Sequence, residues 1–553
     1  MKLAGLASNR GRNLMNIADR APGGAEVAVV LANDADAPVL ESAAKRDMPT
    51  EAVERPEGQG RRAHEKRVRE ALSGYDVDLV CLDGYMRILS DTFLEAMPTT
   101  LNVHPAILPS FPGADAWGDA LEAGVKLTGC TVHVVTDATD DDGDVIEAAV
   151  DAGPVLTQEP VPVYEGDTTA DLKDRVLYQG EFQAYPRAVR WVAEDRVTVD
   201  REAGTVHVAG DDAGVDGDAE LPARRMVSTD RVATLRYGEN PHQDAAVYAD
   251  YTAEEASVVH ADQLNPDARS LSYNNYNDAD AALNLVKEFE EPAAAVIKHT
   301  NPAGCATADA LATAYADALA TDPQSAYGGI VALNRRCDAA TAEQIVDSFK
   351  EIVVAPGYTE AAREILLEKE SLRVLEVGSG ARDAGGESRG LGRPTEAMTE
   401  KPLVGGRLVQ ERDRQALAAA DLEVVTEREP SAEQVETMLF AWRTIKHVKS
   451  NAVVFATGTE TVGIGMGQVS RVDAVHLAGM KAREHAQGKS AGGAVMASDA
   501  FFPFPDGVEK GAEAGVEAVV QPGGSKRDDQ VIEAADELGM AMAFTGTRCF
   551  RHD

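Results

Sequence analysis

The sequence predicts an α/β protein of at least two domains. Its 553 residues exceed the roughly 250–300 at which a single hydrophobic core stops growing. Short apolar runs alternate with helical patterns in the first half, which is typical of a mostly parallel sheet. A glycine- and aspartate-rich stretch at 210–220 lacks periodicity and is typical of a linker. We therefore expect domains at 1–205 and 229–553, joined by an acidic linker at 206–228.

The first half begins with the clearest strand pattern. Residues 2–7 are apolar, the loop SNRGRN follows at 8–13, and a helix is expected to begin at Leu14. Further short apolar runs at 27–32 and 77–82 predict two more strands of the same sheet.

Charge is the unusual feature of the composition. There are 92 acidic and 53 basic residues, giving a net charge of −39. Such a field repels phosphate backbones, which argues against nucleic-acid partners. We interpret the excess of acidic residues as a solvated surface. The aspartate-rich clusters at 140–144 and 211–218 indicate a high-salt cytoplasm, where salt screens the repulsion between these charges.

Targeting and metal signals are weak throughout the sequence. No apolar window approaches 18 residues and no signal peptide is evident, so we expect a cytoplasmic protein without a membrane partner. The five cysteines form no C-x-x-C pair, which argues against a disulfide framework and a cysteine zinc site. No metal ligands are therefore predicted.

The loop at 8–13 has the arrangement of a phosphate site. It lies between a strand and a helix, where backbone N–H groups point outward and Gly11 permits close approach of a ligand. Arg10 and Arg12 add positive charge. An ordinary strand-to-helix turn is the simpler interpretation of this loop alone.

The segment LNVHP at 101–105 is more specific. Asn102 and His104 alternate on one strand, so both side chains project to the same side before Pro105 ends the strand. An amide beside an imidazole can hold a developing oxyanion and move a proton. The alternative is a structural histidine at the end of a strand.

Five motifs in the first half resemble phosphoribosylglycinamide formyltransferase over roughly residues 1–205. They are DGYMRILS (83–90), LNVHPAILPSFPG (101–113), TGCTVHVV (128–135), DAGPVLTQ (151–158) and VPVYEGD (161–167). The resemblance implies a Rossmann-like formyltransferase domain that uses 10-formyltetrahydrofolate. It also implies that His104 stabilises the oxyanion, Asn102 orients it and Asp151 relays the proton.

The same resemblance implies the binding residues of the first half. The folate is expected at Met86, Arg87, Ile88 and Leu89, with Arg62 nearby, and the substrate phosphate at Arg10, Gly11, Arg12 and Asn13.

Three departures from the family pattern bear on this assignment. Asn9 and Arg12 replace a glycine and a serine of the family loop, and ADAW (114–117) replaces a segment that usually contains histidine. About ten extra residues precede Asp151, which leaves Asp140 as a rival for the acid.

Two relatives of this family are alternatives for the first half. Methionyl-tRNA formyltransferase shares the HPxxLP-type motif and the folate, but it needs no phosphate loop at 8–13, and the acidic charge argues against tRNA. Formyltetrahydrofolate hydrolase carries an extra N-terminal regulatory domain that we do not expect here.

The second half contains a marked helix and an unusual dipeptide. Ser431 and Gln434 form a capping box, and an apolar pattern at i, i+3, i+4 and i+7 follows from Val435. Lys298 and His299 follow an apolar strand. A lysine there can stabilise an oxyanion while the imidazole takes a proton. A surface Lys-His pair is the alternative.

Seven further motifs resemble the formyltransferase domain of the bifunctional purine enzyme that acts on aminoimidazole carboxamide ribotide (AICAR). They are LRYGENPHQ (235–243), LSYNN (271–275), TDPQSAYGG (321–329), VKSNAVVFA (448–456), IGMGQVSRV (464–472), MASDAFFPF (496–504) and QPGGSKRDDQVI (521–532). The resemblance covers about residues 229–553. It implies a cytidine-deaminase-like α/β fold in two related halves, with active sites at a homodimer interface.

The resemblance also assigns roles in the second half. His299 removes the proton of a poorly nucleophilic amine and Lys298 stabilises the transition state. The positions that match the ribotide site are Arg236, Tyr237, Gly328, Glu351, Asn451 and Arg471, and those that match the folate site are Asp499 and Arg548. Phe501, Phe502 and Phe504 are expected to pack in the core. Pro505 replaces a family arginine.

Three functional hypotheses follow. The chain performs two formyl transfers, to AICAR and to glycinamide ribotide (GAR), or only its second half is active beside an altered formyltransferase module, or it is a regulator without turnover. Retention of His104, Asn102, Lys298 and His299 argues against the regulator. We find no signature of the ring-closing cyclohydrolase module and expect it to be absent.

Overall fold

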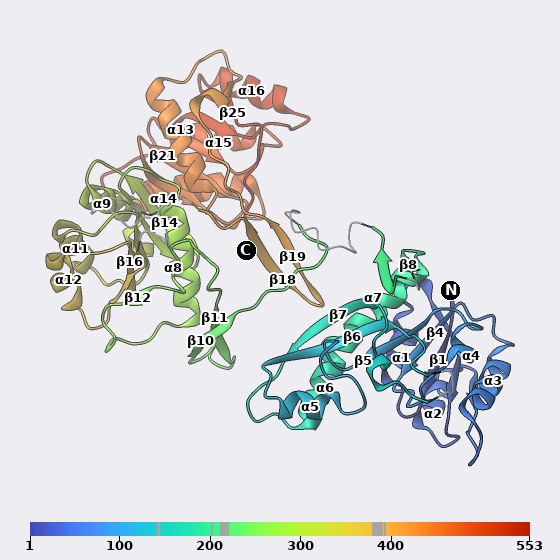
Figure 1. Ribbon diagram of the computed structural model, residues 1–553. Helices are drawn as coiled ribbons and strands as arrows, with labels where there is room; N and C mark the ends of the chain where they lie inside the picture. Colours follow the sequence, from blue (N-terminus) through green and yellow to red (C-terminus); the bar gives the residue numbers. More distant parts are fainter. Residues whose placement is uncertain (141–143, 201–202, 211–220, 379–390, 392–393, 553) are drawn as a thin grey trace. The chain divides into compact units, whose positions relative to one another are not determined.

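The computed structural model describes residues 1–140, 144–200, 203–210, 221–378, 391 and 394–552. The chain divides into two compact units, Met1–Met226 and Val227–Asp553, which are described separately (Figure 1). Residues 211–220 of the expected linker, which include the acidic cluster at 211–218, and part of the cluster at 140–144 lie outside the described residues. Within the part that is described, no helix is long and apolar enough to cross a membrane.

The N-terminal unit contains one mixed sheet with a parallel core. Its order is β3 (Thr50–Ala52), β2 (Glu26–Ala32), β1 (Lys2–Ala7), β4 (Leu79–Asp83), β5 (Thr100–His104), β6 (Leu127–Val134) and β7 (Val155–Pro162). The first five strands in this order are parallel to one another, and β6 pairs antiparallel with both β5 and β7. The prediction of a mostly parallel sheet is therefore confirmed. A small hairpin of β8 (Val197–Asp200) and β9 (Thr205–Val208) carries regular structure past residue 205.

Helices cover this sheet on both faces (Figure 1). They are α1 (Arg12–Arg20), α2 (Pro38–Ala44), α3 (Arg61–Leu72), α4 (Asp91–Leu94), α5 (Ala116–Glu122), α6 (Thr169–Arg175), the π-helical turn η3 (Val176–Glu181) and α7 (Phe182–Ala193). Helix α1 begins two residues before the expected Leu14, because Gly11 adopts the left-handed φ of 56° that turns the chain into the helix. A Cβ atom at Gly11 would lie 2.3 Å from Val39, so the turn requires glycine.

The C-terminal unit is built on a sheet with a nearly palindromic order. Among the described residues its strands run β12 (Asp262–Gln263), β17 (Arg373–Glu376), β16 (Ile352–Ala355), β15 (Ile330–Leu333), β13 (Ala293–Lys298), β14 (Asn301–Thr307), β22 (Glu460–Gly465), β21 (Val453–Thr457), β23 (Ala494–Ser498), β24 (Val516–Gln521), β25 (Ala541–Phe544) and β20 (Glu423–Val424). Each half joins antiparallel strands near the centre to parallel strands outside.

The helices repeat the same order in both halves. They are α8 (Tyr273–Val286), α9 (Leu311–Thr321), α10 (Pro323–Ala326), α11 (Ala339–Val346) and α12 (Glu360–Leu367) in one half, and α13 (Ala432–Ile445), α14 (Arg471–Glu484), α15 (Asp506–Ala514) and α16 (Asp528–Glu537) in the other. Two exposed hairpins, β10 (Asp230–Leu235) with β11 (Ala245–Ala249) and β18 (Met398–Leu403) with β19 (Gly406–Glu411), stand outside the sheet.

A constant spacing relates the two halves. Helices α8 and α13 have the same length and begin with capping boxes at Ser272 and Ser431, which confirms the box predicted at Ser431. The same spacing of 159 residues separates Glu288 from His447, whose side chains meet at 3.0 Å. The two related halves expected from the sequence are therefore visible in the topology.

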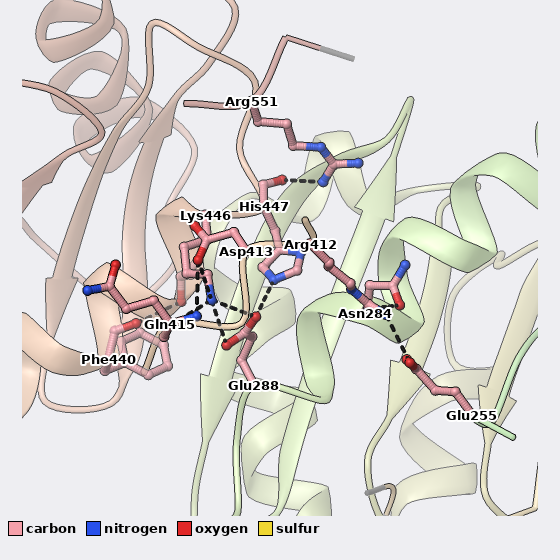
Figure 2. A network of polar contacts seen from close by, with 11 residues as sticks. Glu255, Asn284, Glu288, Arg412, Asp413, Gln415, Phe440, Lys446, His447 and Arg551 are labelled. Carbon is pink, nitrogen blue, oxygen red and sulfur yellow. Dashed lines mark hydrogen bonds and ion pairs between the residues drawn. The ribbon is translucent and has the colours of Figure 1, made fainter. Parts of the chain in front are cut away.

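A buried polar network connects the two halves of the C-terminal unit (Figure 2). Glu288 follows α8 and accepts hydrogen bonds from Lys446, while His447 lies beside the same carboxylate. Glu255 accepts hydrogen bonds from Lys287 at 2.5 Å and from Arg412 at 2.9 Å. Because these charges are buried, each depends on its partner for stability.

Glu255 provides a pH-dependent prediction. Burial alone raises its pKa, but Lys287, the Glu396 N–H group and Arg412 outweigh burial and lower the pKa from 4.5 to about 2. A lowered carboxyl pKa stabilises the fold above the unfolded pKa and loses that contribution as pH falls through the folded pKa. The contribution is about 3 kcal/mol.

Glu255→Gln should therefore lower the free energy of unfolding of the C-terminal unit by about 3 kcal/mol at pH 7 and flatten its loss between pH 4.5 and 2. Denaturant titrations across this pH range measure both effects. Glu513→Gln, in an exposed pair with Lys510, is the control and should change neither. An unchanged pH slope for Glu255→Gln would exclude this origin of acid sensitivity.

Candidate functional site

A cavity of about 910 Å³ opens at the carboxyl ends of β1, β4 and β5 in the N-terminal unit. This edge of a parallel sheet is where α/β proteins bind ligands. The predicted residues that line the cavity are Arg10, Gly11, Arg12, Asn13, Met86, Arg87, Ile88, Leu89, Asn102, His104 and Asp151. The loop at 8–13 and the segment at 86–89 therefore line the same cavity.

His104 lies at the centre of a polar cluster in this cavity. Its Nε2 is 2.7 Å from the Phe111 carbonyl oxygen and its Nδ1 is 3.2 Å from Asp151 Oδ2. Because a carbonyl oxygen only accepts, Nε2 carries a hydrogen, and Nδ1 faces the carboxylate. Burial lowers the pKa of His104, while Asp151 and the Phe111 carbonyl oppose that decrease. The arrangement places a ring nitrogen beside a carboxylate, which is a geometry suited to proton transfer.

Asp151 reaches this cluster through an unusual backbone conformation. Its φ is 56°, in the left-handed region that costs a residue with a Cβ atom of order 1 kcal/mol or more. Its Oδ2 accepts a hydrogen bond from the Gly113 N–H at 3.1 Å. Burial raises the Asp151 pKa, but His133, His104 and the Gly113 N–H together bring it below its usual value. Asp151 is thus an ionised acceptor at neutral pH.

The sequence reasoning missed His133 as a site residue. Residue His133 on β6 pairs in register with Asn102 on β5. Its Nε2 lies 3.2 Å from Asn102 Nδ2 and 3.6 Å from Asp151 Oδ1, so it bridges two of the predicted catalytic residues. The available signal was a histidine within the strand motif TGCTVHVV, which otherwise contains no imidazole or charged side chain.

Beneath the loop at 8–13 lie two buried acids that the sequence reasoning also missed. Asn13 donates its backbone N–H to Asp83 at 2.8 Å and its side-chain amide to Glu181 at 2.5 Å. Burial raises the pKa of Glu181 to about 7. Asn13 was predicted to contact phosphate, but its side chain is 1% exposed and faces these acids. It therefore supports the loop from below, while Arg10 and Arg12 remain at the cavity.

In the C-terminal unit, Lys298 and His299 lie at a tight hairpin turn. Lys298 ends β13 and pairs with Asn301 at the start of β14, which leaves His299 and Thr300 as the two turn residues. Their φ values are 55° and 62°, a conformation that such turns normally give to asparagine and glycine. A β-branched residue is a clear outlier there. The chain therefore accepts backbone strain to present His299.

The residues around the hairpin match several predicted ribotide positions. Lys298 donates from Nζ to the Tyr327 carbonyl at 2.8 Å, next to Gly328, whose φ is 70°. The Glu351 carboxylate accepts a hydrogen bond from Asn275 at 2.9 Å, and the Glu351 N–H group bonds the Gly329 carbonyl. These contacts bring Lys298, Gly328 and Glu351 to one edge of the sheet.

A second cavity, of about 730 Å³, lies in the other half of this unit. The predicted residues Asn451, Arg471 and Arg548 line it. Arg471 also donates to Asn451 Oδ1 at 2.8 Å, so the two residues form one rigid wall. The backbone N–H of Lys449, two residues before Asn451, donates to the Asn301 side chain at 3.0 Å. This hydrogen bond connects the wall to the Lys298–His299 hairpin.

Comparison with known proteins assigns a family to each part of the chain. Residues 1–189 match the family described as formyl transferase, and residues 207–481 match the family described as AICARFT/IMPCHase bienzyme. The chain joins a formyl transferase domain to an AICARFT/IMPCHase domain.

Individual relatives accompany these two matches. The bifunctional purine biosynthesis protein PurH of Magnetococcus marinus is 49% identical over 341 residues, which are 60% of this chain and 62% of the relative's length. The chain thus spans less than two thirds of that relative. Glycinamide ribonucleotide transformylase 1 from Symbiobacterium toebii is 40% identical, covering 38% of this chain and 94% of that one, with a TM-score of 0.34. Phosphoribosylglycinamide formyltransferase from Anaplasma phagocytophilum is 34% identical, covering 38% of this chain and 95% of that one, with a TM-score of 0.33.

Two residues considered for the formyl transferase site, Arg62 and Asp140, lie outside the cavity lining. Arg62 was predicted near the folate, but it lies outside the cavity lining and pairs with Asp91 at 3.6 Å. Asp140, the rival for the acid, is exposed and accepts a hydrogen bond from the Asp144 N–H at 2.8 Å. Of these two acids, Asp151 lines the cavity and Asp140 does not.

In the AICARFT/IMPCHase domain three residues differ from expectation. Asp499 was assigned to the folate, but its side chain is fully buried and pairs with Arg471 beneath the cavity. The prediction that three phenylalanines pack in the core holds for Phe502, which is 1% exposed. It is wrong for Phe501 and Phe504, which are 41% and 47% exposed and line the cavity. The chain leaves β23 at Ser498, so the alternation of a strand does not extend to them.

Arg236 and Tyr237 lie on another element of this domain. They follow β10, and the Arg236 guanidinium lies over the Tyr237 ring at 5.3 Å. The structure does not place them among the residues that line the 730 Å³ cavity. Their assignment to the ribotide phosphate therefore rests on the motif alone.

The buried Asp499–Arg471 pair supports a stability prediction. Asp499→Ala leaves the Arg471 guanidinium, whose side chain is 8% exposed, without its counter-charge. Removing one partner of a buried ion pair costs about 3–5 kcal/mol. Denaturant unfolding should show that loss for the AICARFT/IMPCHase domain. The exposed pair of Lys510 and Glu513 is the reference, and Glu513→Ala should cost less than about 1 kcal/mol. Equal losses for both variants would contradict the assignment.

Proposed function

We propose that this protein performs two formyl transfers of purine nucleotide synthesis, from 10-formyltetrahydrofolate to GAR in the N-terminal unit and to AICAR in the C-terminal unit. The observation that carries the proposal is that each unit presents a histidine in a specialised setting: His104 paired with Asp151 in a cavity, and His299 on a strained turn beside Lys298. The family matches of the two units agree with this division.

In the N-terminal unit, one cavity of about 910 Å³ would hold both substrates. Arg10 and Arg12 would hold the ribotide phosphate at one part of the cavity. The segment Met86, Arg87, Ile88 and Leu89 would hold the pterin at another. Asn102 and His104, at the end of β5, line the same cavity. The folate supplies the activated formyl group that the ribotide amine accepts.

The chemistry of this unit would depend on the His104–Asp151 pair. His104 would stabilise the oxyanion that forms at the formyl carbon, and Asn102 would orient the same oxygen. Asp151 would take the proton released by the amine and pass it toward the departing folate nitrogen. His133 would keep the Asp151 and Asn102 side chains in place.

In the C-terminal unit the acceptor is a weaker nucleophile, because its amine is conjugated with an imidazole ring and a carboxamide. His299 would remove the amine proton, and Lys298 would stabilise the negative charge of the transition state. Arg236 and Tyr237 would meet the ribotide phosphate, with Gly328, Glu351, Asn451 and Arg471 around the rest of the ribotide. Arg548 at the second cavity would contact the folate tail. Asp499 would act by holding Arg471.

Turnover with each ribotide tests the proposal. GAR and AICAR are offered separately with 10-formyltetrahydrofolate at high salt, and tetrahydrofolate release is followed. Release with both ribotides supports two activities. Release with AICAR alone favours an altered N-terminal module, the alternative that the departures at Asn9, Arg12 and 114–117 suggest. Release with neither ribotide contradicts the proposal.

We also propose a cytoplasmic homodimer adapted to high salt. The net charge of −39 supports salt adaptation, since dense anionic surfaces repel themselves unless screened. The dimer rests on the resemblance of the C-terminal unit to its family. Absence of a cyclohydrolase module would leave ring closure to another enzyme, and incubation with both ribotides should then give no inosine monophosphate.

A further inference from the structure

The duplicated C-terminal unit contains two hairpins at equivalent positions, and they differ in their turns. In one half Lys298 pairs with Asn301 around His299 and Thr300, and in the other Thr457 pairs with Glu460 around Gly458 and Thr459. The second turn needs a left-handed residue only at Gly458, with φ 52°. The first needs two, and neither is glycine. The strain is therefore specific to the hairpin that carries His299.

A carboxylate on helix α8 supports the strained turn. Asp278 Oδ1 accepts a hydrogen bond from the Thr300 backbone N–H at 2.7 Å. Burial raises the pKa of Asp278, and the backbone N–H groups of Thr300 and His299 oppose that rise. One helical turn earlier, Asn275 holds Glu351. A single face of α8 thus contacts both the turn and a ribotide position.

The other half of the unit lacks this support. The position equivalent to Asp278, at the same spacing of 159 residues, is Thr437 on α13. The Thr437 hydroxyl donates to the Glu433 carbonyl of its own helix at 3.0 Å rather than bonding to the turn. A carboxylate therefore occurs at the position where the turn bears a histidine, and not where the turn bears glycine. General stabilisation of the hairpin does not explain this difference.

We propose that Asp278 is a positioning residue for AICAR formylation, which holds the His299–Thr300 turn in its left-handed conformation and so aims His299 and Lys298. The inference rests on the proposed function of the C-terminal unit. It predicts a loss in kcat rather than in KM for the ribotide, because Asp278 bonds the turn and the ribotide positions lie elsewhere. A displacement of the catalytic group by about 1 Å can cost about 100-fold in rate.

Four variants of the full-length protein test the inference. Asp278→Ala removes the acceptor and should lower kcat with AICAR by about 100-fold, with KM unchanged within about threefold. Asp278→Asn retains an oxygen acceptor and should keep most of the activity. Asp278→Ala with Thr300→Gly lets glycine adopt the left-handed φ unaided and should recover at least about tenfold of the lost kcat. Thr437→Ala, the matched control from the other half, should leave AICAR turnover unchanged.

Thermal unfolding separates this inference from the proposed function. Asp278→Ala should lower the Tm of the C-terminal unit, and Thr300→Gly should restore part of it, whether or not AICAR is the substrate. If wild-type protein does not formylate AICAR, the proposed function fails while the Tm series still decides the role of Asp278. Equal losses in Asp278→Asn and Asp278→Ala, or no recovery by Thr300→Gly in kcat and Tm, overturn the positioning role.

Discussion

His299→Ala is expected to lower kcat for AICAR formylation by about 10²–10⁴-fold, the usual contribution of a positioned general base. The turn that presents His299 has two left-handed residues with side chains, and Asp278 and Asn301 hydrogen-bond to its backbone. Such strain persists where function requires it. Because GAR turnover is assigned to the other unit, it should be unchanged in this variant. Steady-state kinetics with each ribotide measure both quantities.

Two controls sharpen this result. His260→Ala removes an exposed histidine of the same unit, whose ring contacts Ser257, and should leave both activities intact. Imidazole added to His299→Ala should restore part of the AICAR turnover, since the free base can enter the space of the lost ring. Retention of full AICAR turnover by His299→Ala would exclude it as the base, and Lys298 would be the next group to consider.

Local pattern was enough to predict the elements that carry the catalytic residues. The alternation in LNVHP placed Asn102 and His104 on one side of β5, and both line the cavity. The apolar run before Lys298 formed β13. In each case the signal extends over a few neighbouring residues, and strand geometry alone fixes the side on which the side chains lie.

Contacts between segments distant in the sequence could not be predicted from local sequence pattern. His133 reaches Asn102 through the register of an antiparallel strand pair, which depends on how the whole sheet packs. Asp278 meets Thr300 because α8 packs against β13, 22 residues away. Asp499 was matched to a ligand by motif, yet Arg471 approaches it from 28 residues away and its side chain is fully buried. Burial of a charged group is decided by partners that a motif does not contain.

Asp151→Asn should lower kcat for GAR formylation by about 10³-fold while AICAR turnover stays unchanged. The Asp151 carboxylate lies 3.2 Å from His104 Nδ1, and its pKa is held below the usual value by His133, His104 and the Gly113 N–H against the effect of burial. It is therefore ionised at neutral pH and able to take a proton. An amide cannot take that proton.

Asp140→Asn is the matched control for this experiment, since it also removes one negative charge near the insertion. Its carboxylate accepts the Asp144 N–H and does not line the cavity, so GAR turnover should remain near the wild-type level. A large loss in Asp140→Asn together with a small one in Asp151→Asn would reverse the assignment of the acid. That result would require the Asp140 carboxylate to enter the cavity when the ribotide binds, because Asp140 is not among the residues that line it. Equal rates for both variants and the wild type would leave the amine proton to solvent rather than to a side chain.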